Sequence, residues 1–262
     1  MNMRFARPLF AAAIVLLSTT AQATIIPVAN FNLSSGLLQS GQTALHAVDP
    51  QGKSKFVTDT VFGKQQQVYR FDSSSTNPTQ QAGLQLDTRN LVTDAYTVDM
   101  VFKFDRLTSG YQRLFDVSAR NSDTGAYARD GLIRIYGTAS ASNTRLNANE
   151  YSRLTLTNSG NGLVKAYLNG AWLYDAKSNA LDFDTFTDVN PKNLMSFFLD
   201  DGNEWTAGQV ASIRLYDTVL SANDVTAIGN STPVTPTTAI PAPAPAMLML
   251  GASLLLLRRR AR

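Results

Sequence analysis

A strict two-residue alternation over residues 96–104 constrains the fold of this chain more than any other sequence feature. Every second residue of the segment is large and apolar, and the residues between them are mostly polar or charged. Such a period is typical of a β-strand with one face packed on a core. The apolar face would carry Tyr96, Val98, Met100, Phe102 and Phe104, and the other face Thr97, Asp99, Val101 and Lys103.

Ten further short runs have the composition of strands, and several are bounded by Asn, Asp, Gly or Ser. They are residues 28–33, 67–71, 83–87, 112–117, 132–136, 153–157, 163–168, 171–174, 194–199 and 210–216. Asn169-Gly170 separates two of them and predicts a hairpin, because a type I′ turn needs a positive φ at both positions. Only residues 221–228 predict a helix, with Ser221 as N-cap and Asp224 in a capping box. We therefore predict an all-β, antiparallel two-sheet β-sandwich with one short helix near its end.

Both ends of the chain have the composition of export and anchoring segments. Arg4 and Arg7 precede an apolar run that is followed by Ala21-Gln22-Ala23, which is the order of a secretory signal peptide. A buried N-terminal helix and a disordered basic tail explain the two ends less well. The expected divisions are a signal peptide over 1–23, a β-sandwich over 24–230, a Thr/Pro/Ala-rich linker over 231–245, and a hydrophobic segment with an Arg-rich end over 246–262.

The last 23 residues combine a proline motif, an apolar run and a terminal arginine cluster. The residues are Pro241, Pro243, Pro245, the run 246–257, Arg258, Arg259 and Arg260. This tail resembles the PEP-CTERM sorting signal of Gram-negative bacteria, although Ala242 or Ala244 stands where the signature glutamate would be. The resemblance implies an exosortase-type processing protease, an inner-membrane anchor before cleavage, and delivery to the cell envelope, the surface or the extracellular matrix. Whether the hydrophobic helix is cleaved stays open.

Charge and cysteine content narrow the choice of partners. Six of the 23 Lys and Arg residues lie in the two end segments and none of the 20 acidic residues does, so the rest of the chain carries a net charge of about −3. A nucleic-acid-binding face needs clustered basic residues, and nucleic acid is therefore excluded as a partner. The chain has no cysteine, so an exported domain would rely on core packing or bound metal instead of disulfides.

Several stretches in the body of the chain have the order and spacing of motifs from a known fold. They are RLTLT at 153–157, VKAYLNG at 164–170, FLDD at 198–201, and VASIRLYD at 210–217 followed by LSANDV at 220–225. They resemble a laminin-G-like, concanavalin A-like jelly roll over roughly residues 96–228. The resemblance implies two large antiparallel sheets, one of them concave, in a fold shared by lectins, laminin modules, pentraxins and some glycan hydrolases. Fold alone does not settle function.

Catalytic constellations are scarce in the sequence. His46 is the only histidine and cysteine is absent, so Ser-His, Cys-His and typical zinc chemistry have no support. We expect His46 to be an exposed loop side chain. Hydrolases of the fold carry a Glu-x-Asp-x-x-Glu run or a close variant on one strand, and this chain has none. Asp182 with Asp184, and Asp200 and Asp201 with Glu204, supply paired acids, but neither set puts two glutamates on one face. We predict that the protein is not an enzyme.

Calcium is the metal that the sequence favours, because hard cations bind several oxygens from Asp side chains and loop carbonyls. Asp200 and Asp201 follow an apolar strand and are the main candidate ligands, with Asp123 as a weaker one. Laminin-G-like domains often hold Ca²⁺ at a loop rim, which supports the expectation. The alternative is that these residues serve only turns and N-caps.

A sugar ligand would stack on exposed aromatic faces, although most aromatic residues should belong to the core. The candidates are Trp172, Trp205, Tyr111, Tyr127 and Tyr174. We therefore expect a non-catalytic exported surface or matrix module that binds glycan or protein. The alternatives are a purely structural envelope or exopolysaccharide-associated protein and, less favoured, a glycan-active hydrolase.

Overall fold

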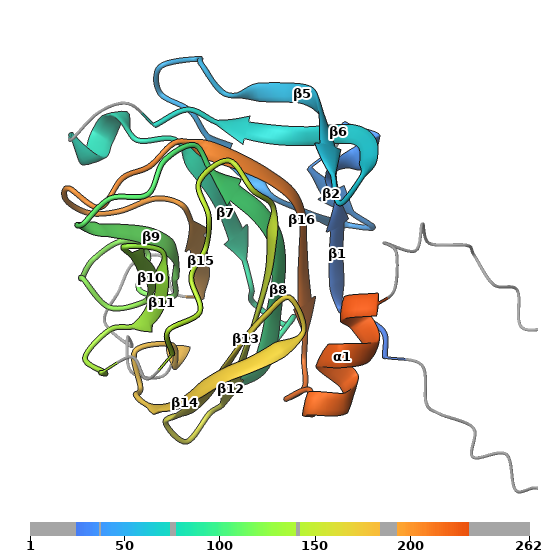
Figure 1. Cartoon of the computed structure of the whole chain (residues 1–262), viewed down its shortest axis with the longest axis vertical. Helices are drawn as coiled ribbons and strands as arrows, with labels where there is room; N and C mark the ends of the chain where they lie inside the picture. Colours follow the sequence, from blue (N-terminus) through green and yellow to red (C-terminus); the bar gives the residue numbers. More distant parts are fainter. Residues whose placement is uncertain (1–24, 37, 74–76, 140–141, 184–192, 231–262) are drawn as a thin grey trace, which may run out of the picture.

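The computed structural model describes residues 25–230, except residue 37 and residues 74–76, 140–141 and 184–192. In this part of the chain two antiparallel sheets pack against each other, as the sequence predicts (Figure 1). The predicted signal peptide, linker and sorting tail, with Pro241, Pro243, Pro245 and the arginine cluster, lie outside the described residues. The helices that are described include none with the length and apolar character needed to cross a bilayer.

The larger sheet has eight strands, and its strand β16 pairs with three others. Beside the main path, β1 (Ala29–Asn32) pairs antiparallel with the second half of β16. In order across the sheet the strands are β14 (Ala171–Lys177), β13 (Leu163–Leu168), β12 (Ser152–Ser159), β8 (Ala95–Phe104), β16 (Gly208–Tyr216), β6 (Lys64–Phe71) and β5 (Lys55–Val61).

The smaller sheet has six strands. In order they are β11 (Leu132–Ile135), β10 (Ala126–Arg129), β9 (Tyr111–Asp116), β15 (Leu194–Phe197), β7 (Gly83–Asp87) and β4 (His46–Val48). A two-stranded sheet of β2 (Gln39–Ser40) and β3 (Thr43–Ala44) and two 3₁₀ turns, η1 (Leu33–Ser35) and η2 (Pro78–Gln80), complete the described elements before the final helix.

The core lies between the sheets, and the predicted apolar face of β8 points into it. Tyr96, Val98, Met100, Phe102 and Phe104 are all buried in the main hydrophobic cluster. The other face of β8 is buried as well, so the expectation of a half-buried strand is wrong. The reason is that β8 lies in the middle of the larger sheet, where its second face is covered by neighbouring side chains and by the segment leading to the helix.

The helix α1 (Ala222–Asn230) begins with the predicted capping box. The Asp224 amide donates to Ser221 Oγ over 3.3 Å, and the Ser221 amide donates to the Asp224 carboxylate over 2.9 Å. Val225 and Ile228 pack with Tyr167 and Tyr216, and Ile25 packs against the same cluster. Both ends of the described chain therefore lie at one pole of the molecule, beside α1 (Figure 1).

The predicted hairpin at Asn169-Gly170 is confirmed, with φ of 51° and 82° at its two central residues. Other short strands escaped the sequence analysis. β5, β10 and β4 were not predicted, and His46 is exposed on strand β4 instead of in a loop. β5 has the polar composition of an edge strand, and β4 and β10 contain only three and four residues.

Candidate functional site

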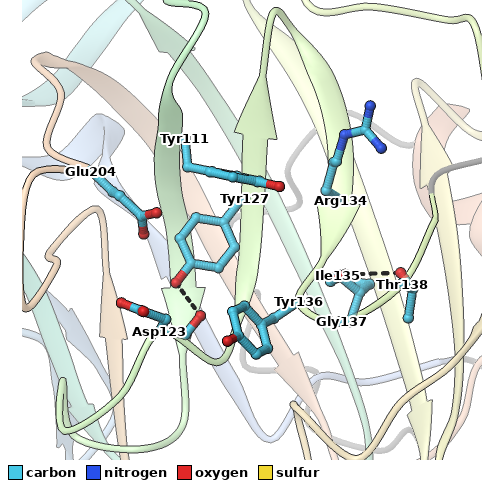
Figure 2. A pocket seen from close by; sticks show the side chains of 9 residues that line it. All are labelled: Tyr111, Asp123, Tyr127, Arg134, Ile135, Tyr136, Gly137, Thr138 and Glu204. Carbon is cyan, nitrogen blue, oxygen red and sulfur yellow. Dashed lines mark hydrogen bonds between the residues drawn. The ribbon is translucent and has the colours of Figure 1, made fainter.

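A cavity of about 410 Å³ opens on the face of the smaller sheet that points away from the core. Strand register places it there: Ala126 and Ala128 of β10 face the core, whereas Tyr127 between them pairs with Arg113 of β9 and Arg134 of β11. The cavity is lined by Tyr111, Asp123, Tyr127, Arg134, Ile135, Tyr136, Gly137, Thr138 and Glu204 (Figure 2).

Three tyrosines supply the aromatic surface of the cavity. Tyr111 and Tyr136 are 39% and 48% exposed, whereas Tyr127 is buried. The rings of Tyr111 and Tyr127 meet edge to face with their centroids 5.4 Å apart, and the guanidinium carbon of Arg129 lies 5.0 Å from the Tyr111 ring centroid. These contacts hold Tyr111 against the sheet while leaving part of it open to solvent.

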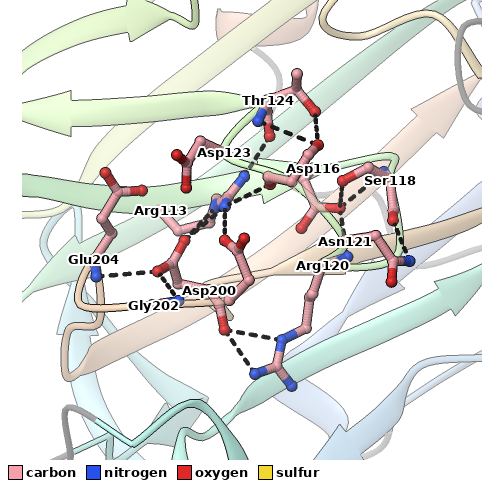
Figure 3. A network of polar contacts seen from close by, with 12 residues as sticks. Arg113, Asp116, Ser118, Arg120, Asn121, Asp123, Thr124, Asp200, Gly202 and Glu204 are labelled. Carbon is pink, nitrogen blue, oxygen red and sulfur yellow. Dashed lines mark hydrogen bonds and ion pairs between the residues drawn. The ribbon is translucent and has the colours of Figure 1, made fainter.

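Arg113 lies opposite Tyr127 on the neighbouring strand and is fully buried. Its guanidinium carbon is 4.5 Å from the Tyr127 ring centroid. Its Nη2 atom lies 2.6 Å from Asp200 Oδ1 and 2.9 Å from Asp201 Oδ1, and its Nε donates to Asp200 Oδ1 over 2.9 Å. A buried charge is tolerated when it is paired and its hydrogen-bonding capacity is filled, and this network meets both conditions (Figure 3).

Asp200 is the centre of the network and organises the loop that reaches the cavity. Its Oδ2 atom accepts from the amides of Gly202 and Glu204 over 2.6 and 3.1 Å, and its own amide donates to Gln81 over 2.7 Å. Burial alone would raise the pKa of Asp200, but the Arg113 charge and the hydrogen bonds outweigh burial and hold the pKa below its ordinary value. Asp200 therefore stays ionised, and its carboxylate fixes the position of the Glu204 backbone amide.

Glu204 and Arg134 each present a buried polar atom without a hydrogen-bond partner among the described residues, namely Glu204 Oε2 and Arg134 Nε. Figure 2 shows the two side chains on opposite sides of the Tyr111 and Tyr127 rings. Burial, and secondly the charge of Asp200, raise the pKa of Glu204 to about 7, although the Arg113 charge and the Tyr127 hydroxyl oppose this shift. Buried polar groups in folded proteins are almost always satisfied. Glu204 Oε2 is thus an available acceptor and Arg134 Nε an available donor, and the two suit the hydroxyl groups of a bound molecule.

The predicted calcium ligands are brought together only in part, and Arg113 takes the position that a cation would need. Both carboxylate oxygens of Asp200 are engaged by protein donors, and Asp201 contacts the same guanidinium. The side chain of Asp123 instead lines the cavity, and its carbonyl accepts from the Tyr127 hydroxyl. Across the described ranges, no group of three or more His, Cys, Asp or Glu residues could hold a metal ion. These residues do not fit Ca²⁺ while Arg113 is in place, and the sequence-based prediction of calcium binding stays untested.

Two of the five aromatic candidates, Tyr111 and Tyr127, lie at the cavity. The other three do not line it. Trp172 is 61% exposed on β14 and donates to Asp175, Trp205 receives the Arg106 guanidinium on its ring, and Tyr174 is buried with its hydroxyl on the Ile133 carbonyl. Sequence analysis missed Tyr136, Arg113 and Arg134. The one available signal for Arg113 was an arginine within a predicted strand, residues 112–117, that also contains three apolar residues.

Comparison with known proteins identifies the family. Residues 78–226 match the model of the concanavalin A-like lectin/glucanases superfamily named for laminin G domains, which is more than half of the chain. The chain belongs to this superfamily. The match begins before residue 96, where the resemblance in the sequence started, and it confirms the predicted jelly roll. No curated protein matches the chain.

Solved structures of other proteins share the fold at low sequence identity. Domain 4 of AbnA, a GH43 extracellular arabinanase from Geobacillus stearothermophilus solved in complex with arabinotriose, is 16% identical with a TM-score of 0.58, over 78% of this chain and 98% of its own. The botulinum neurotoxin serotype G binding domain is 13% identical with a TM-score of 0.51, over 78% of this chain and 50% of its own. The binding domain of botulinum neurotoxin DC, solved with rat synaptotagmin II, is 12% identical with a TM-score of 0.50, over 72% and 46%. This chain therefore spans about half of the two neurotoxin domains.

Proposed function

We propose that the protein is a non-catalytic carbohydrate-binding module and that the cavity beside Tyr111, Tyr127 and Tyr136 is its saccharide site. The observation that carries the proposal is the combination of exposed tyrosine rings with the unpaired Glu204 Oε2 and Arg134 Nε atoms around one cavity. Sugar rings present apolar faces that pack on aromatic side chains and hydroxyl groups that need both donors and acceptors. The cavity supplies all three.

The way the cavity is built supports binding without large rearrangement. Its floor belongs to three hydrogen-bonded strands, and the buried Arg113–Asp200 pair holds the loop of Glu204 against them. Sites on a rigid scaffold lose little conformational entropy on binding. Superfamily membership and the arabinotriose complex of AbnA domain 4 give further support to a saccharide as the ligand.

The proposal includes export. The order of charged, apolar and small residues over 1–23 and the resemblance of residues 240–262 to a PEP-CTERM signal support an exported protein of the envelope, surface or matrix, processed by an exosortase-type protease. In this setting the ligand would be an extracellular polysaccharide or a glycan on a surface protein.

Tyr136→Ala tests the saccharide site, because this ring is the most exposed of the three and supports no part of the core. Binding of the full-length protein to a panel of polysaccharides and oligosaccharides is measured first, followed by calorimetry on the best ligand. We expect the substitution to weaken binding by roughly five- to thirtyfold, the effect of losing about 1–2 kcal/mol at an aromatic contact. Trp172→Ala, which removes an exposed aromatic side chain that does not line the cavity, should leave the affinity unchanged.

The outcomes separate the competing functions. Equal loss in the two variants, or no binding to any glycan, would contradict the cavity as a saccharide site and favour a structural role. A glycan hydrolase is the second candidate, because a carboxyl group with a pKa of about 7 is suited to a general acid. Release of reducing ends that Glu204→Gln abolishes would overturn the non-catalytic proposal, and we expect no release.

A further inference from the structure

Four oxygen atoms from two loops surround the guanidinium of Arg113. Asp200 Oδ1 and Asp201 Oδ1 come from the loop after β15, and the main-chain carbonyls of Ser122 and Thr124 come from the loop between β9 and β10. The contact from Nη2 to the Ser122 carbonyl is 3.2 Å. Carboxylate and carbonyl oxygens from separate loops are the ligand set that proteins use for hard cations such as Ca²⁺. Here the cation is a side chain of the protein itself.

The guanidinium of Arg113 and the carboxylate of Asp200 are both buried and lie beside further charged groups. The side chains of Arg113 and Asp200 have no solvent exposure, and that of Asp201 is 28% exposed. Burial alone would lower the pKa of Arg113, but the nearby carboxylates of Asp116 and Asp200 outweigh burial and raise it. The carboxylates beside Arg113 therefore favour a positive charge at its position, and the neighbouring Arg120 guanidinium donates to the Asp200 carbonyl.

The backbone closes around the guanidinium at Gly125. A Cβ atom at this position would lie 2.9 Å from Arg113 Nη1 and 2.7 Å from the Phe115 carbonyl, and φ is +139°, a conformation that only glycine adopts readily. The 121–125 loop can thus approach Arg113 closely enough for its carbonyls to accept hydrogen bonds.

We propose that Arg113 acts as an internal cation in the place of a bound metal ion. Its guanidinium joins the loop of Asp123 to the loop of Glu204. Removal of Arg113 would leave a latent divalent-cation site formed by Asp200, Asp201, Ser122 and Thr124. The cavity would consequently keep its shape without calcium. This inference concerns how the loops are held and does not depend on saccharide binding.

Thermal unfolding of the full-length protein in chelator and in millimolar Ca²⁺ tests the proposal. For the wild type we expect the same Tm in both conditions. Arg113→Ala should have a lower Tm in chelator and should regain stability as Ca²⁺ is added, with the Tm rising with the logarithm of calcium concentration as mass action requires. Mg²⁺ should be less effective, because it demands a smaller and more regular octahedral site.

Controls separate a cation site from a general effect on folding. Arg113→Ala combined with Asp200→Asn should lose the response to Ca²⁺, and Arg113→Lys, which keeps a positive charge, should fold and stay indifferent to calcium. Arg145→Ala removes an exposed arginine that hydrogen-bonds the Asp130 carbonyl and should behave like the wild type. A wild-type Tm that rises with Ca²⁺ would overturn the proposal, and so would an Arg113→Ala variant that calcium neither stabilises nor restores to the folded state.

Discussion

Burial raises the pKa values of Asp116 and Glu204 above their ordinary range. The pKa of Asp116 is raised to about 6, although the Arg113 charge and hydrogen bonds from Ser118 and Arg120 oppose the effect of burial. Its Oδ1 atom accepts these bonds, and its Oδ2 atom has no partner among the described residues. For Glu204, burial and the Asp200 charge act in the same direction, and its pKa reaches about 7. Both groups hold a proton more tightly in the folded protein than in the unfolded chain.

Glu204 therefore makes stability depend on pH in a definite direction. Between its ordinary value of 4.5 and its folded value of about 7, the folded state binds more protons than the unfolded state, so the free energy of unfolding falls as pH rises through this window and levels off above it. Glu204→Gln removes this contribution, and the variant should gain stability relative to the wild type as pH increases from 5 to about 7.5. Urea unfolding at several pH values measures the difference.

Glu150→Gln is the matched control, since Glu150 is the only other glutamate and is exposed. The stability difference between this variant and the wild type should not change over the same pH range. A constant difference for Glu204→Gln as well would contradict the inferred environment of Glu204.

The chemistry of the cavity was only partly predictable at the residue scale. Tyr111 and Tyr127 were candidates because aromatic faces stack on sugar rings, and both line the cavity. The role of Arg113 was not predictable, because an arginine is buried only when partners exist, and its partner Asp200 lies 87 positions away in the chain. The same pairing explains why adjacent Asp200 and Asp201 in a loop resembled a calcium site in the sequence.

At the scale of elements, a second buried charge network joins three strands of the larger sheet. Asp99 of β8 accepts from Arg214 Nε of β16 over 3.0 Å and from Thr155 Oγ1 of β12 over 2.7 Å. Arg153 of β12 lies 3.8 Å from the same carboxylate, and its Nη1 donates to the Ile228 carbonyl in the last turn of α1. A cation at a helix C-terminus satisfies a free carbonyl and opposes the helix dipole. The network thus attaches α1 to the sheet.

Asp99→Ala should be strongly destabilising, because it leaves Arg214 and Arg153 buried without their carboxylate. Breaking a buried pair in this way costs about 3–5 kcal/mol. Asp175→Ala is the control: it removes an exposed partner that lies 3.9 Å from Lys165, a pair worth about 0–1 kcal/mol. Chemical denaturation of the two variants measures the difference, and equal losses of stability would show that the Asp99 network does not hold the helix.

Strands could be predicted from the sequence where apolar and polar residues alternate, because one face of such a strand packs on the core. β7 and β13 have the predicted bounds, and α1 begins within one residue of its predicted start. β5 was not predicted, because it is an edge strand whose residues KFVTDTV are mostly polar. β10 was not predicted, because it contains only four residues and its pairing with β9 contains a bulge beside Tyr127. Irregular pairing of this kind depends on neighbouring strands and leaves little trace in local sequence.

At the scale of the whole molecule, the export proposal predicts a processed protein. Cells expressing the full-length chain should yield a mature form that begins at Thr24 and lies outside the cytoplasm, because a signal peptide over residues 1–23 would be removed. Cell fractionation with N-terminal sequencing measures this outcome. A variant lacking residues 246–262 should be released into the medium or periplasm instead of being retained at the membrane, and a cytoplasmic protein that keeps Met1 would contradict export.

The ends of the described part of the chain meet beside α1, and this has a further consequence. Ile25 packs on the cluster that contains Ile228, and the strands of the cavity, β9 to β11, lie on the opposite side of the molecule (Figure 1). Neighbouring termini allow circular permutation and insertion of a domain into another chain. The sandwich should therefore tolerate being spliced into a surface loop of a host protein as a single cassette, with its tyrosine-lined face directed away from the host.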